Sequence, residues 1–375
     1  MNVPLYYAKF YKIFQVTLQM QLTRPTLKRL VLLTLGVYGA KSFIISEVAR
    51  QLLPLKSFSA SRKMLTRFFA QPLETYRNIL EIFAQRVVEK VQDNRIILIL
   101  DYTRMPVINL DVLFASIPLE GRAIPIYFEI LFPWIIGKAS KNLFEVEFVK
   151  KLRKILPHEK DIIITWDRGF AKGEVIKRII NIPGVYFVGR IRKDTAVFIN
   201  GKKQIVGGIN LEKGKIFSFP SLYGLSYKIP CLLVGYWQKE MKEPWWIVTS
   251  LKERPFIILK VYRQRFWIEE GFRDLKNEFE MNKNYFREKT KEDRFEKFLI
   301  ACVIGYFFIY ALGLINKDKQ SYFVESSKKK EKKISCFFLG VKILSSYLFI
   351  KRANEGRLIK ALSLAGSLRT IVEKF

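Results

Sequence analysis

Two short apolar runs in the middle of the chain place the strongest limit on its fold. RIILILD (95–101) and DIIITWD (161–167) are continuous hydrophobic stretches, and each ends in an aspartate. A strand that is apolar on both faces must be covered on both faces, which is typical of sheets with helices on either side. Strand patterns RAIPIYFEILF and GVYFVGRIRK and helix patterns NLFEVEFVKKLRKIL and AKGEVIKRIIN surround these runs. This alternation predicts an α/β layer.

The region before this layer, residues 22–92, has the apolar periodicity of helices. Within it we expect a helix-turn-helix, with helices over 47–53 and 60–69 capped by Ser46 and Ser59 and separated by Pro54. The second helix carries three cations suited to phosphates or guanine edges: Arg62, Lys63 and Arg67. An ordinary helical pair with a solvated basic face fits these residues equally well.

Residues 195–243 differ from the layer around them. Short stretches of alternating apolar and polar residues are interrupted by Asn-Gly (200–201), Gly-Gly (207–208) and Tyr-Gly (223–224). Such dipeptides are typical of hairpin turns and predict a β insertion. EPWWIVTSL then returns as a strand, and a long helix is expected from near Phe256. We therefore predict five regions: helical 1–92, catalytic 93–194, inserted strands 195–243, catalytic 244–315, and 316–375, a Lys-rich loop followed by a basic helical tail.

One apolar run could belong either to a membrane or to a core. FLIACVIGYFFIYALGLI (298–315) holds 18 residues without a charge, near the lower limit for a membrane span. No second such run accompanies it, so we expect a helix buried in a large core and no membrane association.

The charge of the chain points to a polyanionic partner. There are 65 Lys and Arg against 34 Asp and Glu, a net charge of +31, which favours nucleic acid first and an anionic membrane surface second. A basic chain without such a partner is the remaining reading. Cys231, Cys302 and Cys336 match no metal or disulfide spacing, and the first 18 residues do not resemble a signal peptide. We expect a cytoplasmic, nucleoid-associated protein.

Catalysis in this chain must rely on carboxylates, Lys, Tyr or a thiol rather than on imidazole. His158 is its single histidine, which excludes metal sites built from histidines and argues against a Ser-His-Asp mechanism. Asp101 and Asp167 each end a predicted strand, and the rim of an α/β sheet is where such proteins place their sites. Aspartate also commonly ends strands as a turn residue, so these two residues alone leave both readings open.

The segment VYRQRFWIEEGFRDLK supplies a third acid. Counted from Tyr262, the residues Arg265, Glu269 and Lys276 follow after 3, 7 and 14 positions. On one helix this spacing places the four side chains within a sector of roughly 60°, along about 21 Å of the helix axis. A stripe of this kind can also be a solvent-exposed face whose side chains form ion pairs with one another. Apolar neighbours such as Phe266 and Ile268 indicate that the rest of the helix belongs to a core.

This segment resembles the Y-x2-R-x3-E-x6-K signature of bacterial insertion-sequence transposases with a ribonuclease-H-like catalytic domain. Tyr262, Arg265, Glu269 and Lys276 match every element and spacing. WDRGF is similar to that group's D-x-G-[FY] motif, and LDYT to its first aspartate with the residues that follow. The resemblance covers about residues 25–315. It implies an α/β fold with a ribonuclease-H-like core, a β insertion, a helical DNA-binding region before the core and helices after it.

The resemblance also implies a site and a reaction. Asp101, Asp167 and Glu269 would hold two Mg²⁺ or Mn²⁺ ions, with Asp101 bridging them. Tyr262, Arg265 and Lys276 would hold phosphates near the transposon end, and Arg168 is a further candidate phosphate contact. An extruded base would stack on Trp245, with Trp246 as the fallback.

The function implied is cut-and-paste DNA transposition through a hairpin intermediate. Its partners would be transposon ends and target DNA, with a homodimer in the synaptic complex and no small-molecule cofactor. A ribonuclease-H-like nuclease without strand transfer, or an inactive transposase that only binds DNA, are the alternatives.

Overall fold

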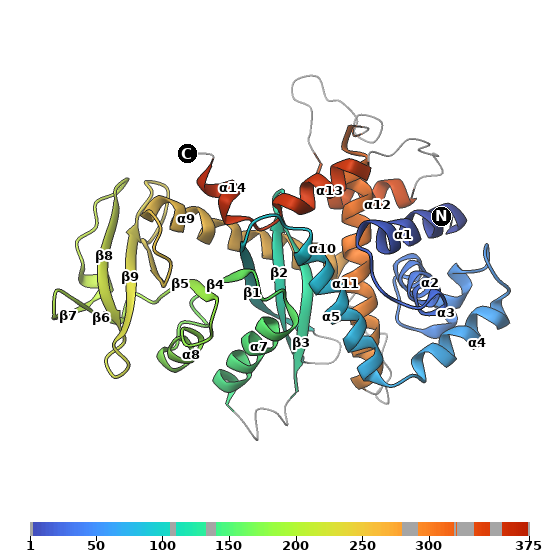
Figure 1. Ribbon diagram of the computed structural model, residues 1–375, viewed down its shortest axis with the longest axis horizontal. Coiled ribbons are helices and arrows are strands. Elements are labelled where there is room, and N and C mark those ends of the chain that lie inside the picture. The colour runs from blue at the N-terminus through green and yellow to red at the C-terminus, as the bar shows by residue number, and fades with distance from the viewer. Residues whose placement is uncertain are drawn as a thin grey trace.

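A computed structural model describes residues 3–105, 110–132, 140–279, 292–318, 320, 334–345 and 355–373. One twisted sheet runs through the molecule, with the N-terminal helices at one end and the inserted strands at the other (Figure 1). Its strand order is β3-β2-β1-β4-β5-β10-β9-β8-β6-β7. The strands are β1 (Arg95–Met105), β2 (Leu110–Leu119), β3 (Arg122–Leu131), β4 (Asp161–Trp166), β5 (Val185–Arg190), β6 (Ala196–Ile199), β7 (Lys202–Ile205), β8 (Ile216–Tyr223), β9 (Ile229–Tyr236) and β10 (Trp245–Thr249).

Only the centre of the sheet is parallel. β4 pairs in parallel with β1 and with β5, and antiparallel strands extend the sheet on both sides. The sequence missed β2, which makes a hairpin with β3 through Glu120 and Gly121, both in the left-handed region. The expected end of the first strand at Asp101 was also wrong. β1 continues to Met105 because its second half pairs with β2, with Asp101 opposite Phe114.

The predicted β insertion is present, and its strands belong to the same sheet. β10 pairs with β5 on one side and with β9 on the other, so no break separates the insertion from the catalytic strands. Asn200 and Gly201, at φ 50° and 76°, turn β6 into β7 as predicted. The hairpin expected at 207–208 was wrong, because these glycines lie in a single 3₁₀ turn, Val206–Gly208.

Helices cover both faces of the sheet (Figure 1). Alternate side chains of β1 divide between two cores: Leu98 and Leu100 pack with α5 (Leu73–Glu89) and α7 (Lys141–Ile155), and Ile97 packs with α9 (Pro255–Arg263). α8 (Gly173–Ile179) packs against α7 and β9. This arrangement confirms the α/β layer predicted from the apolar runs.

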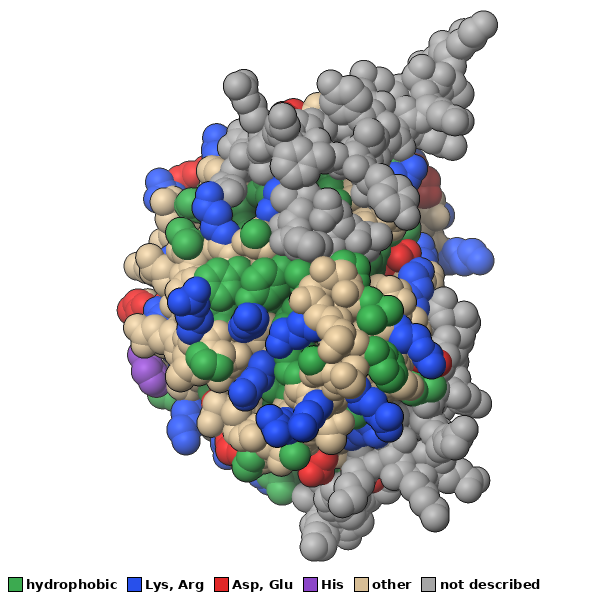
Figure 2. All heavy atoms as spheres, turned by 90° about the vertical axis from the view of Figure 1, so that its right-hand side faces the viewer, with side chains coloured by type: hydrophobic (Ala, Val, Ile, Leu, Met, Phe, Trp, Pro, Cys, Tyr) green, Lys and Arg blue, Asp and Glu red, His purple; other side chains and the backbone are tan. Residues whose placement is uncertain are grey.

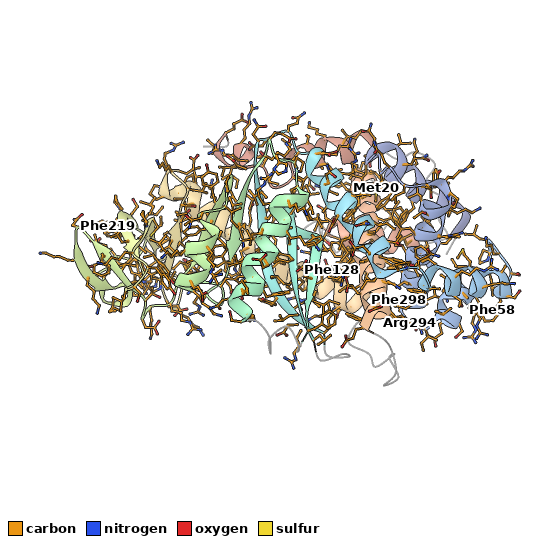
Figure 3. The ribbon with its side chains drawn as sticks, turned by 60° about the horizontal axis from the view of Figure 1, so that its bottom comes forward. Met20, Phe58, Phe128, Phe219, Arg294 and Phe298 are labelled. Carbon is orange, nitrogen blue, oxygen red and sulfur yellow. The ribbon has the colours of Figure 1, made fainter. Side chains whose placement is uncertain are left out.

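The long apolar run forms a helix in the core, as expected. α11 (Glu292–Ile315) is buried from Phe295 to Ile315. It is long and apolar enough to cross a membrane by length and composition, and its apolar stretch is fully buried within the fold. Its Phe298 ring stacks on Phe43 at 4.9 Å between centroids, where α11 meets the N-terminal helices (Figure 3).

The N-terminal region is helical, as predicted, but the helix starts differ. The helices are α1 (Val3–Lys12), a π-helical turn (Ile13–Thr17), α2 (Arg24–Ala40), α3 (Ile45–Gln51) and α4 (Phe58–Phe69). The caps expected at Ser46 and Ser59 were wrong. Ser46 lies inside α3, and Ser57 caps α4 by accepting from the Ala60 amide at 3.4 Å. Each helix begins two residues earlier than the polar residues indicated, at apolar Ile45 and Phe58.

Helices also follow α11, as expected. They are α12 (Cys336–Ser345), α13 (Glu355–Leu364) and α14 (Leu368–Val372), while most of the predicted loop 316–333 lies outside the described residues. The chain before α14 is tied to the sheet, because the Ile97 amide donates to the Gly366 carbonyl at 2.7 Å. These helices therefore help to cover the sheet.

Candidate active site

The two aspartates stand side by side on adjacent parallel strands. The last registered pair between β1 and β4 is Ile99 with Thr165, and two residues further along each chain come Asp101 and Asp167. Each carboxylate is oriented by a neighbouring amide. Asp101 Oδ1 accepts from the Tyr102 amide at 2.8 Å, and Asp167 Oδ1 accepts from the Gly169 amide at 2.7 Å.

The helix that carries the third acid is broken, contrary to our expectation of one long helix. α9 ends at Arg263, a 3₁₀ turn spans Gln264–Phe266, and α10 spans Trp267–Glu278. Tyr262 consequently does not share an open polar stripe with Glu269. Its side chain is 1% exposed and lies in the apolar cluster beneath α9, whereas Glu269 is exposed.

Arg265 joins the acid of the helix to the acid of the strand. Its guanidinium lies 3.6 Å from Asp101 Oδ2 and donates to Glu269 Oε1 at 3.1 Å, and the residue is buried. Arg265 lies within the 3₁₀ turn at Gln264–Phe266. We call Asp101, Asp167, Glu269 and Arg265 the carboxylate site.

The carboxylate site holds more negative charge than its single arginine offsets. The pKa of Asp101 is raised to about 7, chiefly by burial and also by the nearby charges of Asp167 and Glu269, while Arg265 opposes the rise. A desolvated group of acids of this kind is the setting that a divalent cation neutralises, and carboxylate oxygens are the ligands that Mg²⁺ and Mn²⁺ prefer. In donor chemistry, the three acids fit such an ion.

The acids are not gathered into a closed metal cage. Within the described part of the chain, no group of three or more His, Cys, Asp or Glu side chains lies close enough to hold a metal ion. Arg265 lies between Asp101 and Glu269 and takes up a contact on each. Arg265 would therefore have to release these contacts for an ion to join the two acids.

The two tryptophans face opposite sides of β10. Trp245 is half-buried, with its ring stacked on Phe266 at 5.4 Å and its edge against Tyr262. Trp246 is 2% exposed and packs in the core on the other face. This burial argues against Trp246 as a base platform. The burial of Tyr262 likewise argues against a direct phosphate contact, and places that residue as a support for Trp245.

The remaining predicted contacts lie around the rim. Arg168 is exposed and pairs with Glu243, at 3.1 Å, in the loop before β10. Lys276 lies further along α10, half-buried, with its pKa lowered by burial and no ion-pair partner among the residues that the structure describes. Both cations remain placed where a phosphate could reach them.

Sequence reasoning missed a buried acid beside the site. Glu145 of α7 is 1% exposed, and burial raises its pKa to about 7, opposed by the charges of Lys172 and Lys141. Its neighbour Tyr102, which follows Asp101, stacks on Phe170 at 5.3 Å. An acid on the apolar face of the pattern NLFEVEFVKKL was the signal that could have revealed it.

The predicted basic helix lines a groove at the other end of the molecule. Arg62, Lys63 and Arg67 are exposed on α4. A groove of about 430 Å³ lies between α4 and the start of α2. Its cations are Lys28, Arg29, Lys56, Lys63 and Arg67, which we call the basic groove. Figure 2 shows Lys and Arg side chains gathered on this end with few acids among them. The sequence did not reveal Lys28, Arg29 and Lys56, because only the fold brings them beside α4.

Comparison with known families gives one match. Residues 140–308 match the family model described as a transposase DDE domain. The matched segment contains Asp167 and Glu269, and Asp101 precedes it. A search of curated proteins found no match.

Proposed function

The chain is a transposase of the DDE type, and on that premise we propose that it cuts transposon ends by metal-dependent phosphoryl transfer and joins them to target DNA. The alternatives of a nuclease without strand transfer and of an inactive DNA-binding protein become outcomes of the tests below. A homodimer that holds two ends together in a synaptic complex is part of the proposal.

The observation that carries the proposal is that acids from three separate elements lie around one buried arginine and within electrostatic reach of one another. Asp101 comes from β1, Asp167 follows β4, and Glu269 reaches Asp101 through Arg265. The raised pKa of Asp101 indicates that these charges are uncompensated in the protein alone. Two bound Mg²⁺ or Mn²⁺ ions would activate the attacking hydroxyl and stabilise the leaving oxygen. Asp101 would bridge the two ions, and Asp167 and Glu269 would each complete one.

Arg265 has two successive roles in this proposal. Without metal, it pairs with Asp101 and Glu269 and offsets the repulsion between the two acids. If a metal ion took over these two acids, the guanidinium would be free to hold the phosphate next to the cleaved bond, which suits its planar, two-pronged donors. Lys276 and Arg168 contact the backbone on either side.

The test compares two adjacent glutamates of α10. Glu269→Gln should abolish both cleavage of an end-containing duplex and joining to a plasmid, in Mg²⁺. Glu270→Gln is the matched control, since Glu270 pairs with Arg273 and Arg122. The proposal fails if Glu269→Gln cleaves as fast as Glu270→Gln. Cleavage without joining in the wild type would support the nuclease alternative.

The hairpin step rests on Trp245. Its ring lies beside the carboxylate site with one face on Phe266, so an extruded base would stack there once Phe266 moves aside. Loss of such a stack costs about 1–3 kcal/mol, or roughly tenfold in the affected step. Trp245→Ala should leave first-strand nicking nearly normal and slow hairpin formation, as resolved on a denaturing gel. A wild type that nicks without ever giving a hairpin-length product would remove this step.

A further inference from the structure

A second pocket lies on the same face of the sheet as the carboxylate site. It encloses about 440 Å³ between the end of β2, the break between α9 and α10, and the segment from α13 to α14. This is within the range of about 300–1,000 Å³ in which proteins bind small organic groups. One wall is the half-buried ring of Trp267, the first residue of α10.

Two polar side chains in the lining lack partners. Gln264 Oε1 and Thr370 Oγ1 are both buried, and neither has a hydrogen-bond partner among the described residues. Buried oxygens are nearly always satisfied by protein, water or ligand. Gln264 lies at the helix break and Thr370 in α14, two distant parts of the chain. The fold therefore brings an amide oxygen and a hydroxyl, both without hydrogen-bond partners, to one pocket.

The rim of the pocket is basic. Lys260 and Arg263, one turn apart on α9, both line it. Arg263 is exposed and held by long hydrogen bonds to Tyr236 and Gln238, and Lys260 lies over the Phe256 ring. The single acid in the lining is Glu120, which pairs with Lys317. An aromatic wall, unfilled polar atoms and rim cations match the base and phosphate of a nucleotide.

We propose that this pocket binds one unpaired nucleotide of the DNA substrate, with its base on Trp267 and its phosphate at Lys260 and Arg263. The base lies against Gln264 and Thr370, whose buried side-chain oxygens lack partners in the protein. Every DNA base carries an amino or imino hydrogen, so the subsite accepts any of the four. This inference rests on the proposed transposase function and adds a single-strand subsite distinct from Trp245.

The position of the pocket fits a strand leaving the carboxylate site. Gly366 in its lining lies against the Ile97 carbonyl, four residues before Asp101 on β1. At about 3.3 Å per residue this is about 13 Å, close to four base steps of a DNA strand. A strand that has lost its partner at the cut end can therefore span both places.

The experiment compares fluorescence anisotropy of a blunt duplex with that of the same duplex carrying a five-nucleotide single-stranded extension. Wild type should bind the extended DNA more tightly, and one abasic position within the extension should remove most of that gain. Trp267→Ala should lower affinity for the extended DNA about tenfold, the scale of one lost stack, and leave blunt binding unchanged. Gln264→Leu should reduce it several-fold.

Two further variants keep the outcome decisive. Trp267→Phe retains an aromatic wall and should restore most of the preference for extended over blunt DNA. This variant keeps the test decisive if Trp267→Ala folds poorly. Trp237→Ala removes a half-buried tryptophan of the insertion, outside the pocket, and should bind the extended DNA as wild type does. The pocket assignment is overturned if Trp267→Ala, Trp267→Phe and wild type bind extended DNA equally. Because Mg²⁺-dependent cleavage is measured separately, that result would leave the transposase function standing.

Discussion

The carboxylate site and the basic groove handle charge in opposite ways. At the carboxylate site, Asp101 and Arg265 are largely buried, and each charge is set by neighbours a few ångströms away. In the basic groove, the cations of α2 and α4 are exposed, Lys56 in the turn before α4 is half-buried, and no acid is in the lining. Burial makes charge interactions strong and dependent on position, whereas exposed charges act mainly through their sum.

This difference separates chemistry from affinity. A buried acid has no substitute, because its removal changes both the local charge and the metal ligands. An exposed cation is one of several that attract DNA, so removing it lowers DNA affinity only in part. The four predictions that follow test this contrast between the two regions.

The largest effect is expected at the carboxylate site. Asp101→Asn and Asp167→Asn should each lower single-turnover cleavage in Mg²⁺ at least a thousandfold, about 4 kcal/mol of barrier. Binding of end DNA should stay largely intact because the basic groove is unchanged. Asp194→Asn, an exposed acid after β5, is the control and should cleave normally. Near wild-type cleavage by either variant would remove that residue from the site.

The next effect is graded and belongs to the basic groove. Replacing Lys28, Lys63 and Arg67 by Ala should reduce the slope of log affinity against log salt by about 3, roughly 0.9 for each lost phosphate contact. Filter binding at salt concentrations between about 50 and 200 mM measures this slope. Over this range the affinity of a protein with about six or more phosphate contacts changes strongly. A triple Ala variant at exposed Lys202, Lys203 and Lys239 is the matched control.

The same groove variant also tests sequence preference. If α4 reads base edges, affinity for element ends should fall more than affinity for random DNA. Equal losses on both DNAs would leave α4 as a solvated basic face that binds phosphates only.

A smaller effect is expected in the pH dependence of metal binding. Since the pKa of Asp101 is raised to about 7 without metal, protons compete with metal below that pH. Apparent Mn²⁺ affinity should therefore rise about fivefold from pH 6 to pH 7, about twofold more by pH 8, and level off above that. Titration calorimetry at pH 6, 7 and 8 measures this, and Asp101→Asn should lose the slope. A pH-independent affinity would contradict a role for Asp101 as ligand.

The smallest effect concerns stability beside the site. The pKa of Glu145 is raised from 4.5 to about 7 by burial, so its contribution to stability falls as pH rises from about 4.5 to about 7. Glu145→Gln should raise the free energy of unfolding at pH 8 by at most about 3 kcal/mol, and little at pH 4.5. Urea unfolding at both pH values checks this. Glu147→Gln, exposed on the same helix, should change neither value.

The sequence indicated most strands, the buried helix and the three acids because each has a recognisable local sequence pattern. Apolar runs ending in Asp101 and Asp167 predict neighbouring strands, and a chargeless run of 18 residues predicts a core helix. The break at Gln264–Phe266 has no such pattern, since it contains neither Gly nor Pro. Tyr262 just before it and Arg265 within it are both buried, and only the tertiary structure supplies the contacts that bury them.

Long-range pairing was the other limit. The segment of β2 mixes Ser116 and Pro118 with apolar residues, so its alternation is weak, yet its pairing extends β1 beyond Asp101. The cations Lys28 and Arg29 look like an ordinary helix start until α2 packs beside α4. The domain boundaries remain predictions, because one large apolar cluster includes side chains from all five regions.

The position of β10 sets an order of assembly for the nascent chain. β10 is the last strand of the sheet to be synthesised, yet it lies between β5 and β9, which are made earlier. Until it inserts, both neighbours present unpaired edges, and exposed edges are where chains join one another. Closing such long-range pairs is slow. The newly made protein therefore passes through a stage in which aggregation competes with the last step of sheet formation.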